Sequence, residues 1–319
     1  MTLLHALKKF FIDDPITRTK KIYFWCFSFL GLHFSFLYVP FYYLYVRRLL
    51  RVGKDGRVGM MQVGSVIVRG CNLRCQYCTV YSPYRKGLIP AEELSASYTE
   101  WRKKIKPQYF ILVGGEPLLH PELERIVRDS ARIWNDSKLW LTTNGLQLER
   151  LKPEVIQALK ETGYKIIVSE HTFEPEHRKR LDAGYARLKE AKIPFVVKPS
   201  RVAWVATHEY DGKGEIVPYQ SDPNKAWNHC AFRACVDISG DQLYRCGYLL
   251  FVAHAVREGV LDGDHWKAAL TYSPLTLQST SDEILRHLCR RVIPECTVCP
   301  DKRNVVPSRQ LPIQQNRKG

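Results

Sequence analysis

The chain has 319 residues, of which 45% are hydrophobic and 25% charged, as in an ordinary globular protein with a sizeable core. Its formal net charge of +16 favours anionic partners, which include phosphorylated substrates, nucleic acid and an acidic membrane surface. Charge alone does not choose among them.

The ten cysteines are grouped rather than spread along the chain. Cys26 stands alone, and the other nine fall at 71–78, 230–246 and 289–299. This grouping argues against a disulfide framework and for metal binding. Residues 1–21 are largely polar, and no small-residue cleavage site follows the next apolar run. We therefore expect a reducing, cytoplasmic location.

Residues 22–46 carry no formal charge and are dense in Phe, Tyr and Trp, with basic residues on both sides. The segment is long enough to span a bilayer, and its aromatic residues also suit the headgroup zone. The alternative is a pair of buried helices broken near Pro40. Both membrane association through residues 22–46 and packing against the rest of the protein are open at this point.

After a basic, glycine-containing linker at 51–57, short apolar runs alternate with amphipathic stretches. The pattern predicts strands at 65–68, 109–113, 138–141, 165–169 and 194–198. It predicts helices at 91–105, 121–134, 153–161 and 175–191. Such alternation is typical of an α/β fold with a parallel sheet and right-handed crossovers, whose functional site lies at the carboxyl ends of the strands.

From about residue 210 the alternation stops, and a stretch rich in Gly, Asp, Pro and Asn follows. We therefore predict an N-terminal extension at 1–58, a core at 59–212 and a cysteine-rich domain at 213–319. Within the last, a hairpin is expected at 236–243, with two amphipathic stretches near Trp266 and at 284–288.

Cys71, Cys75 and Cys78 come directly after the first predicted strand. Three thiolates can hold three irons of a four-iron cluster and leave the fourth iron open for a cofactor or substrate. Zinc is the alternative, but structural zinc sites usually have four protein ligands, and this loop contains no fourth Cys or His.

The triad, with Tyr77 just before its third cysteine, resembles the signature of the radical S-adenosylmethionine (SAM) superfamily. The run Gly114-Gly115-Glu116-Pro117 after the second strand resembles the Gly-Gly-Glu-Pro motif of the same superfamily. The resemblance covers about residues 59–302. It implies a partial (β/α)6 TIM-like barrel and a [4Fe–4S] cluster that cleaves SAM to methionine and a 5′-deoxyadenosyl radical. That radical would then remove a hydrogen atom from a substrate carbon.

The resemblance also implies residues that contact SAM. Glu116 and the neighbouring carbonyl groups would receive the ammonium of its methionine part. Polar residues after later strands would contact its carboxylate or ribose, or the substrate. For each of these the alternative is a turn residue or a helix cap. The expected cofactor-binding residues are Gly114, Gly115, Glu116, Pro117, Asn144, Ser169, Glu170 and Lys198.

The later cysteines resemble the Twitch or SPASM-like extension of radical SAM enzymes, in which they bind an auxiliary [4Fe–4S] cluster. The expected ligands come from Cys230, Cys235, Cys246, Cys296 and Cys299. Either Cys230 or Cys235 can be the first ligand, and Cys235 is slightly preferred. The spacing Gly240-x5-Cys246 departs from the Gly-x4-Cys of the family. Cys289 and Cys26 are expected to be packed, unliganded side chains.

The resemblance leads us to expect oxidation or epimerisation of a polar, sugar-like or phosphorylated small molecule, with a low-potential electron donor such as flavodoxin or ferredoxin. The string at 167–171 is similar to the aminocyclitol dehydrogenase branch of the family. One alternative is a radical SAM peptide maturase. An alternative of another class is a zinc-binding RNA or membrane adaptor; for the enzyme interpretation, nucleic acid is not an expected partner.

Overall fold

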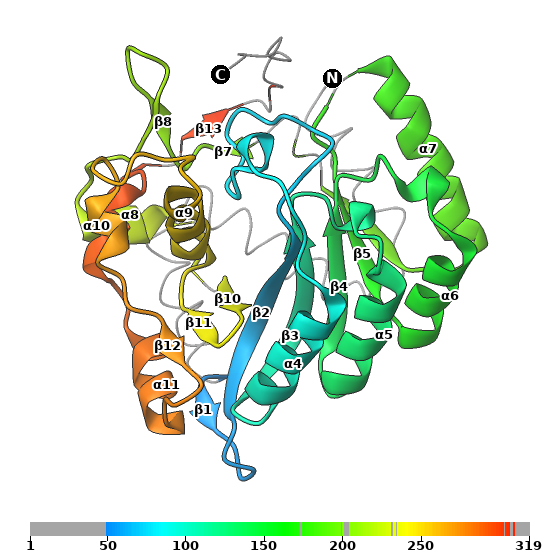
Figure 1. The fold of residues 1–319 in the computed structure, drawn as a ribbon, viewed down its shortest axis with the longest axis horizontal. Coiled ribbons are helices and arrows are strands. Elements are labelled where there is room, and N and C mark those ends of the chain that lie inside the picture. The colour runs from blue at the N-terminus through cyan, green and yellow to red at the C-terminus, as the bar shows by residue number, and fades with distance from the viewer. Residues whose placement is uncertain are drawn as a thin grey trace, which may run out of the picture. The chain divides into compact units, whose positions relative to one another are not determined.

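Five parallel strands form one side of the sheet, out to its edge at β6, and they lie side by side in the order of the sequence (Figure 1). They are β2 (Val58–Val68), β3 (Ile105–Gly114), β4 (Lys138–Thr143), β5 (Lys165–Ser169) and β6 (Phe195–Lys198). This computed structural model describes residues 49–309 except 173, 199, 201–203, 231, 234, 303, 307 and 308. Because successive strands are parallel neighbours, their carboxyl ends meet at one edge of the sheet.

A helix follows each of the first four of these strands. The helices are α4 (Ala91–Arg102), α5 (Leu123–Ile133), α6 (Pro153–Thr162) and α7 (Pro175–Glu190). Proline in the first turn starts α6 and α7, and Gly163 ends α6 at a positive φ of 72°. The predicted α/β fold with a parallel sheet is confirmed.

Three predicted boundaries are wrong. The strand expected at 65–68 already begins at Val58, and the strand expected at 109–113 already begins at Ile105. The helix expected at 91–105 ends at Arg102, and Ile105 instead begins β3, where it pairs with Val58. Pro107 lies in β3, and a proline disfavours the helical conformation in the residue before it, so this helix could not have continued through Lys106.

The main core lies between the sheet and these helices. Phe110 of β3 stacks on Trp134 with ring centroids 5.1 Å apart, and both side chains are fully buried. Tyr98 of α4 is buried beside them, and its hydroxyl donates to Ser65 Oγ at 2.9 Å. Large apolar side chains on this face hold the helices on the sheet.

The C-terminal part of the chain extends the same sheet. The predicted hairpin is present as β10 (Val236–Ser239) and β11 (Gln242–Tyr244), which turn at Gly240. β10 pairs parallel with β2, and β12 (Leu275–Thr276) pairs with β11. The sheet therefore crosses the boundary predicted at residue 212, and the division into a core and a separate domain stays a prediction.

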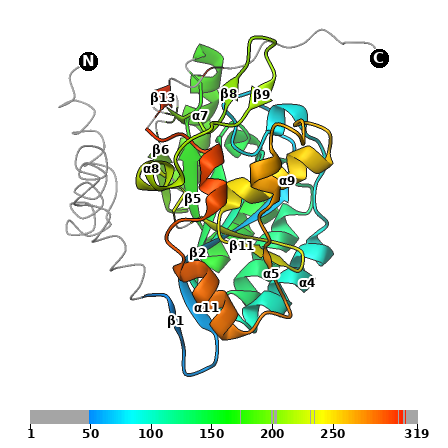
Figure 2. The same cartoon turned by 90° about the vertical axis from the view of Figure 1, so that its left-hand side faces the viewer.

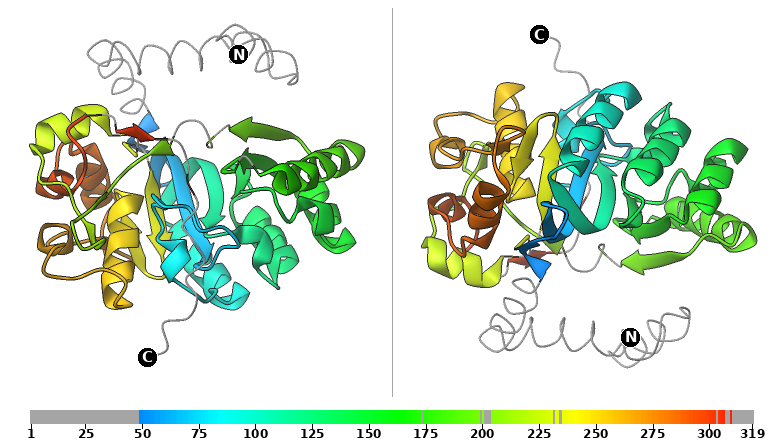
Figure 3. Two further views of the ribbon diagram at one scale, coloured as in Figure 1. Left: turned by 90° about the horizontal axis from the view of Figure 1, so that it is seen from above. Right: turned by 90° about the horizontal axis from the view of Figure 1, so that it is seen from below.

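Helices α8 (Pro223–His229), α9 (Gly247–Arg257), α10 (Lys267–Leu270) and α11 (Ser281–Cys289) belong to this part (Figures 2 and 3). α10 and α11 match the two predicted amphipathic stretches, whereas α9 was not predicted. α9 is almost wholly buried and forms a second core with Tyr81 and Trp266. Because α9 has no broad polar face, its sequence lacks the alternation of hydrophobic and polar residues that predicts an amphipathic helix.

Short elements complete the described structure. The strands are β1 (Arg51–Val52), β7 (Trp204–Val205), β8 (Glu209–Tyr210), β9 (Ile216–Val217) and β13 (Val305–Val306). The 3-10 helices are η1 (Ser82–Tyr84), η2 (Pro117–Leu119), η3 (Leu148–Arg150) and η4 (Pro294–Val298). Residues 22–46 and Cys26 lie outside the described residues. Among the described helices, none is long and apolar enough to cross a membrane.

Candidate active site

The three cysteines of the triad lie in the loop that follows β2, as predicted. Short turns shape the loop, because the Cys78 amide donates to the Cys75 carbonyl at 3.2 Å and the Tyr81 amide donates to the Cys78 carbonyl at 3.1 Å. Burial, and then the charge of Glu116, raise the pKa of the Cys71 thiol to about 12. Binding to a metal reverses this preference, because a metal stabilises the thiolate.

The glycines after β3 let this loop pack closely on the neighbouring strand. A Cβ atom on Gly115 would lie 2.1 Å from the Gly70 carbonyl oxygen, and one on Gly114 would lie 2.4 Å from the Val68 carbonyl oxygen. The Gly115 amide donates to the Val68 carbonyl at 2.8 Å. Only glycine permits this close contact. It includes Gly70, the residue just before Cys71.

Glu116 is completely buried between the ends of β3 and β4. Its carboxylate accepts hydrogen bonds from the Thr143 hydroxyl at 2.7 Å, the Asn144 amide at 2.7 Å and the Leu118 amide at 3.0 Å. Burial raises the pKa of Glu116 to about 7, although these hydrogen bonds act to lower it. The side chain therefore ties two strand ends together.

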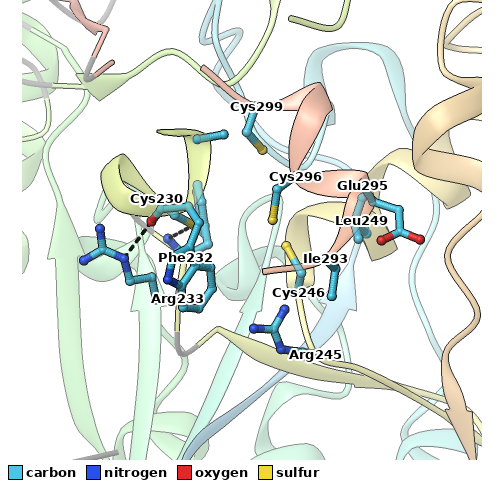
Figure 4. A pocket seen from close by; sticks show the side chains of 12 residues that line it. Cys230, Phe232, Arg233, Arg245, Cys246, Leu249, Ile293, Glu295, Cys296 and Cys299 are labelled. Carbon is cyan, nitrogen blue, oxygen red and sulfur yellow. Dashed lines mark hydrogen bonds between the residues drawn. The ribbon is translucent and has the colours of Figure 1, made fainter. Parts of the chain in front are cut away.

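Four of the five cysteines expected to bind the auxiliary cluster gather around one pocket (Figure 4). Cys230 follows α8, Cys246 precedes α9, Cys296 lies in η4 and Cys299 follows it. Burial, together with a smaller effect of neighbouring thiols, raises the pKa of Cys230 to about 11 and that of Cys246 to about 12. Four thiols from three separate segments are the donor set of an iron–sulfur cluster.

Two guanidinium groups, those of Arg233 and Arg245, line the same pocket. Both lower the pKa of the Cys230 thiol, against the effect of burial. Arg245 lies over the ring of Trp227 at 5.0 Å, and Arg233 donates to the carbonyl of the same residue at 2.9 Å. Positive charge beside thiolates offsets part of the cost of burying them.

Cys235 does not line this pocket, so the geometry does not support the sequence-based preference for it over Cys230. Its Sγ accepts a hydrogen bond of 3.4 Å from the Gln62 side chain of β2, while its carbonyl accepts from the Gly247 amide. The sequence could not separate the two cysteines, because both precede the hairpin, whereas in the structure only Cys230 lines the pocket with the other three thiols. No three His, Cys, Asp or Glu side chains among the described residues stand close enough to share a single metal ion.

Comparison with protein families identifies the part of the site that contains the cysteine triad. Residues 65–191 match the Radical SAM superfamily, and this range contains the cysteine loop and the Gly-Gly-Glu-Pro run. Residues 65–191 form a radical SAM domain. The predicted cofactors of such a domain, a [4Fe–4S] cluster and SAM, are confirmed with it.

Curated proteins similar to the radical SAM domain are named GTP 3′,8-cyclases. That of Aquifex aeolicus (strain VF5) is 40% identical over 119 residues, which are 35% of each chain. That of Mycobacterium tuberculosis (strain ATCC 25618 / H37Rv), GTP 3′,8-cyclase 1, is 36% identical over 124 residues, 36% of this chain and 33% of the relative. The chain thus spans about a third of the length of these relatives.

Solved structures similar to this one also contain SAM. The structure titled BtrN in complex with AdoMet and 2-DOIA has a TM-score of 0.46 at 17% identity and covers 75% of this chain and 92% of its own. The structure of native anSMEcpe with bound AdoMet has a TM-score of 0.36 at 20% identity and covers 43% of each chain.

Asn144, a predicted SAM-contact residue, contacts the triad of the radical SAM domain directly. Its side-chain amide donates to the Asn72 side chain at 2.7 Å and to Cys71 Sγ at 3.5 Å. The side chain therefore links the end of β4 to the cysteine loop. Ser169, at the end of β5, is buried nearby in the sheet edge.

Glu170 and Lys198 point in different directions. The Glu170 carboxylate pairs with Arg178 at 2.8 Å and accepts a hydrogen bond from Tyr185 at 2.8 Å, so it is held by α7. Lys198 lies at the end of β6. Burial lowers the pKa of its amine, and the charge of Cys235 acts to raise it, so the amine lies on the side of the C-terminal segment. A role for either of them in binding SAM stays a prediction.

A group of aromatic side chains packs against the cysteine loop and was not predicted from the sequence. His208 is buried and packs against Tyr77, Tyr81 and Tyr210, with ring centroids 5.4 to 5.5 Å away. Trp204 donates to the Tyr77 carbonyl at 2.6 Å. Residues 204–210 have no helical or strand period, and their density of aromatic residues was the signal that could have marked them.

Proposed function

We propose that this protein is a radical SAM enzyme that removes a hydrogen atom from a polar, anionic small molecule and oxidises it. Cys71, Cys75 and Cys78 would hold the SAM-binding [4Fe–4S] cluster, and Cys230, Cys246, Cys296 and Cys299 an auxiliary one. When bound, the first cluster supplies the electron that cleaves SAM to methionine and a 5′-deoxyadenosyl radical. The observation that carries the proposal is the cysteine loop at the end of β2, packed on Gly114 and Gly115.

The chemistry of the second site supports oxidation. A substrate that has lost a hydrogen atom must lose one more electron and a proton to become an oxidised product. Four thiolates occupy all four irons of a [4Fe–4S] cluster, so such a cluster has no open iron for substrate and is suited to accept that electron. The four thiols around one pocket are the donor set that this role needs.

The substrate class rests on charge and on the relatives. The excess of positive charge favours an anionic substrate, and the relatives are named for an enzyme that acts on GTP, a phosphorylated nucleoside. We propose a phosphorylated or sugar-containing small molecule, with a low-potential electron donor such as flavodoxin or ferredoxin as the protein partner. Cyclisation of GTP is a second candidate, because identity to a GTP 3′,8-cyclase reaches 40% over 119 residues.

The test is product analysis under strict anaerobiosis. The reconstituted protein, SAM and a chemical reductant should yield 5′-deoxyadenosine, and the triple variant Cys71→Ala, Cys75→Ala, Cys78→Ala should yield none. A panel of aminocyclitols, sugar phosphates and nucleotides should then stimulate this formation selectively. Turnover of GTP to a cyclised product would favour the second candidate, and 5′-deoxyadenosine from the triple variant would defeat both.

A further inference from the structure

Two buried tyrosines lie between the two cysteine sites. Tyr81 follows Cys78 by three residues in the cysteine loop, and Tyr248 follows Cys246 by two residues at the start of α9. Their hydroxyl oxygens are 2.8 Å apart, and both side chains are at most 1% exposed. A hydrogen bond thus joins a residue next to the triad to a residue next to the C-terminal pocket.

The direction of this hydrogen bond follows from a third group. The Tyr248 hydroxyl donates to the Thr207 carbonyl at 2.9 Å, so its oxygen is left to accept the proton of Tyr81. Burial raises the pKa of the Tyr81 hydroxyl, and the nearby thiols of Cys299 and Cys78 raise it further. Both cysteine sites therefore lie close to Tyr81.

Tyr81 holds an unfavourable backbone conformation while it makes this contact. Its φ of 57° and ψ of 26° are left-handed, a conformation that is unfavourable for a residue with a side chain. Packing of its ring against Tyr248, His208 and Trp266 offsets this cost. A loop free to relax would not keep that conformation.

The other end of α9 is attached to the same loop. The guanidinium of Arg85 donates two hydrogen bonds to Glu258, at 2.7 and 2.8 Å, and a third to the Val80 carbonyl at 3.1 Å. The Arg85 side chain is 2% exposed and that of Glu258 is 31% exposed, so the guanidinium end of this ion pair is buried while the carboxylate end reaches solvent. The cysteine loop is therefore attached to both ends of α9, through Tyr248 at its start, next to Cys246, and through Glu258 just after its end.

We propose that Tyr81 and Tyr248 are positioning residues that fix the cysteine loop on α9 and so set the separation of the two cysteine sites. Electron transfer through protein falls steeply with distance, so a fixed separation makes the exchange of electrons between the sites reproducible. The role in electron exchange rests on the proposed function. The hydrogen bond between Tyr81 and Tyr248, which we call the clamp, is present in the folded chain whatever the function is.

Hydrogen exchange of the full-length, reconstituted protein tests the clamp. Tyr81→Phe and Tyr248→Phe each keep the ring and remove one hydroxyl of the pair. Each should speed exchange of the amides of residues 76–85 by roughly 5- to 10-fold, the factor that corresponds to one lost buried hydrogen bond. The double variant should add little, because both hydroxyls belong to one chain of hydrogen bonds.

Tyr98→Phe is the matched control, because Tyr98 is another buried tyrosine with one hydroxyl partner, Ser65, on the helix-covered face of the sheet. It should leave exchange at 76–85 as in the wild type. Electron paramagnetic resonance of the reduced protein gives a second measurement, since the spin–spin interaction between the two clusters should weaken in Tyr81→Phe and not in Tyr98→Phe.

Two outcomes would overturn the inference: wild-type exchange in both Tyr81→Phe and Tyr248→Phe, or equally fast exchange in Tyr98→Phe. Failure of the proposed function would look different. In that case the wild-type protein would form no 5′-deoxyadenosine, while the exchange measurements could still be compared among the variants.

Discussion

The Thr143 hydroxyl donates to the Glu116 carboxylate at 2.7 Å, and this hydrogen bond joins the end of β4 to the end of β3 inside the sheet edge. Two backbone amides, those of Leu118 and Asn144, complete the set of donors. The sequence motif predicted Glu116 as a contact for SAM. The structure adds that the same carboxylate shapes the edge on which SAM would rest.

Glu116 should make stability depend on pH. Burial raises its folded-state pKa to about 7 from the ordinary value of 4.5, so the folded state holds a proton that the unfolded state has released between these values. This contribution is therefore present in full below about pH 4.5 and is lost as the pH rises through 7. Glu116→Gln cannot ionise, so the wild type should lose stability relative to it between pH 5 and 7.5.

Urea unfolding of both proteins at several pH values measures this difference. At pH 5 the variant should be less stable by about 1–3 kcal/mol, because the amide group of Gln cannot accept all three hydrogen bonds. A gap that stays constant or widens toward pH 7.5 would show that burial does not control the ionisation of Glu116.

Gly115→Ala should displace the cysteine loop. The new Cβ atom would lie 2.1 Å from the Gly70 carbonyl oxygen, and a backbone group cannot rotate away as a flexible side chain can. We expect a loss of about 1–3 kcal/mol of stability and reduced iron at the triad. Gly212→Ala is the control, since its Cβ atom would have no neighbour within 4 Å. Equal iron content and equal urea midpoints for the two variants would contradict the tight contact.

Cys230→Ala and Cys235→Ala should separate the two candidate ligands. The reconstituted wild type should hold roughly eight irons per chain if both clusters are four-iron clusters. Cys230→Ala should reduce this to roughly four, because Cys230 lines the pocket with the other three thiols. Cys235→Ala should keep the full amount. Iron and sulfide analysis decides the matter, and loss of iron in Cys235→Ala alone would restore the original sequence-based preference.

Removal of residues 1–48 should leave the fold intact. Residues from Leu49 onward form one compact unit with its own core, so the truncated protein should unfold cooperatively in urea. If residues 22–46 meet a membrane, only the full-length protein should sediment with vesicles that contain anionic lipid. Equal sedimentation of both proteins, or loss of folding on truncation, would argue for packing of this segment against the rest of the protein.

The sequence determined the parts of this protein that depend on local order. The spacing of hydrophobic residues and the positions of turn residues predicted the five parallel strands and their helices. This works because neighbouring βα units pack by one repeated geometry. The cysteine triad could be found for the same reason, since its three residues lie in a single loop.

Only the tertiary structure decided which distant groups meet. Cys230, and not Cys235, lines the pocket with Cys246, and the Tyr81 hydroxyl meets that of Tyr248 across 167 positions of the chain. α9 was invisible to the sequence analysis because it is buried on nearly all sides, so its hydrophobic residues show no period. Such contacts depend on how whole segments pack around one core, and that is set by the sum of many weak interactions rather than by the order of a few residues.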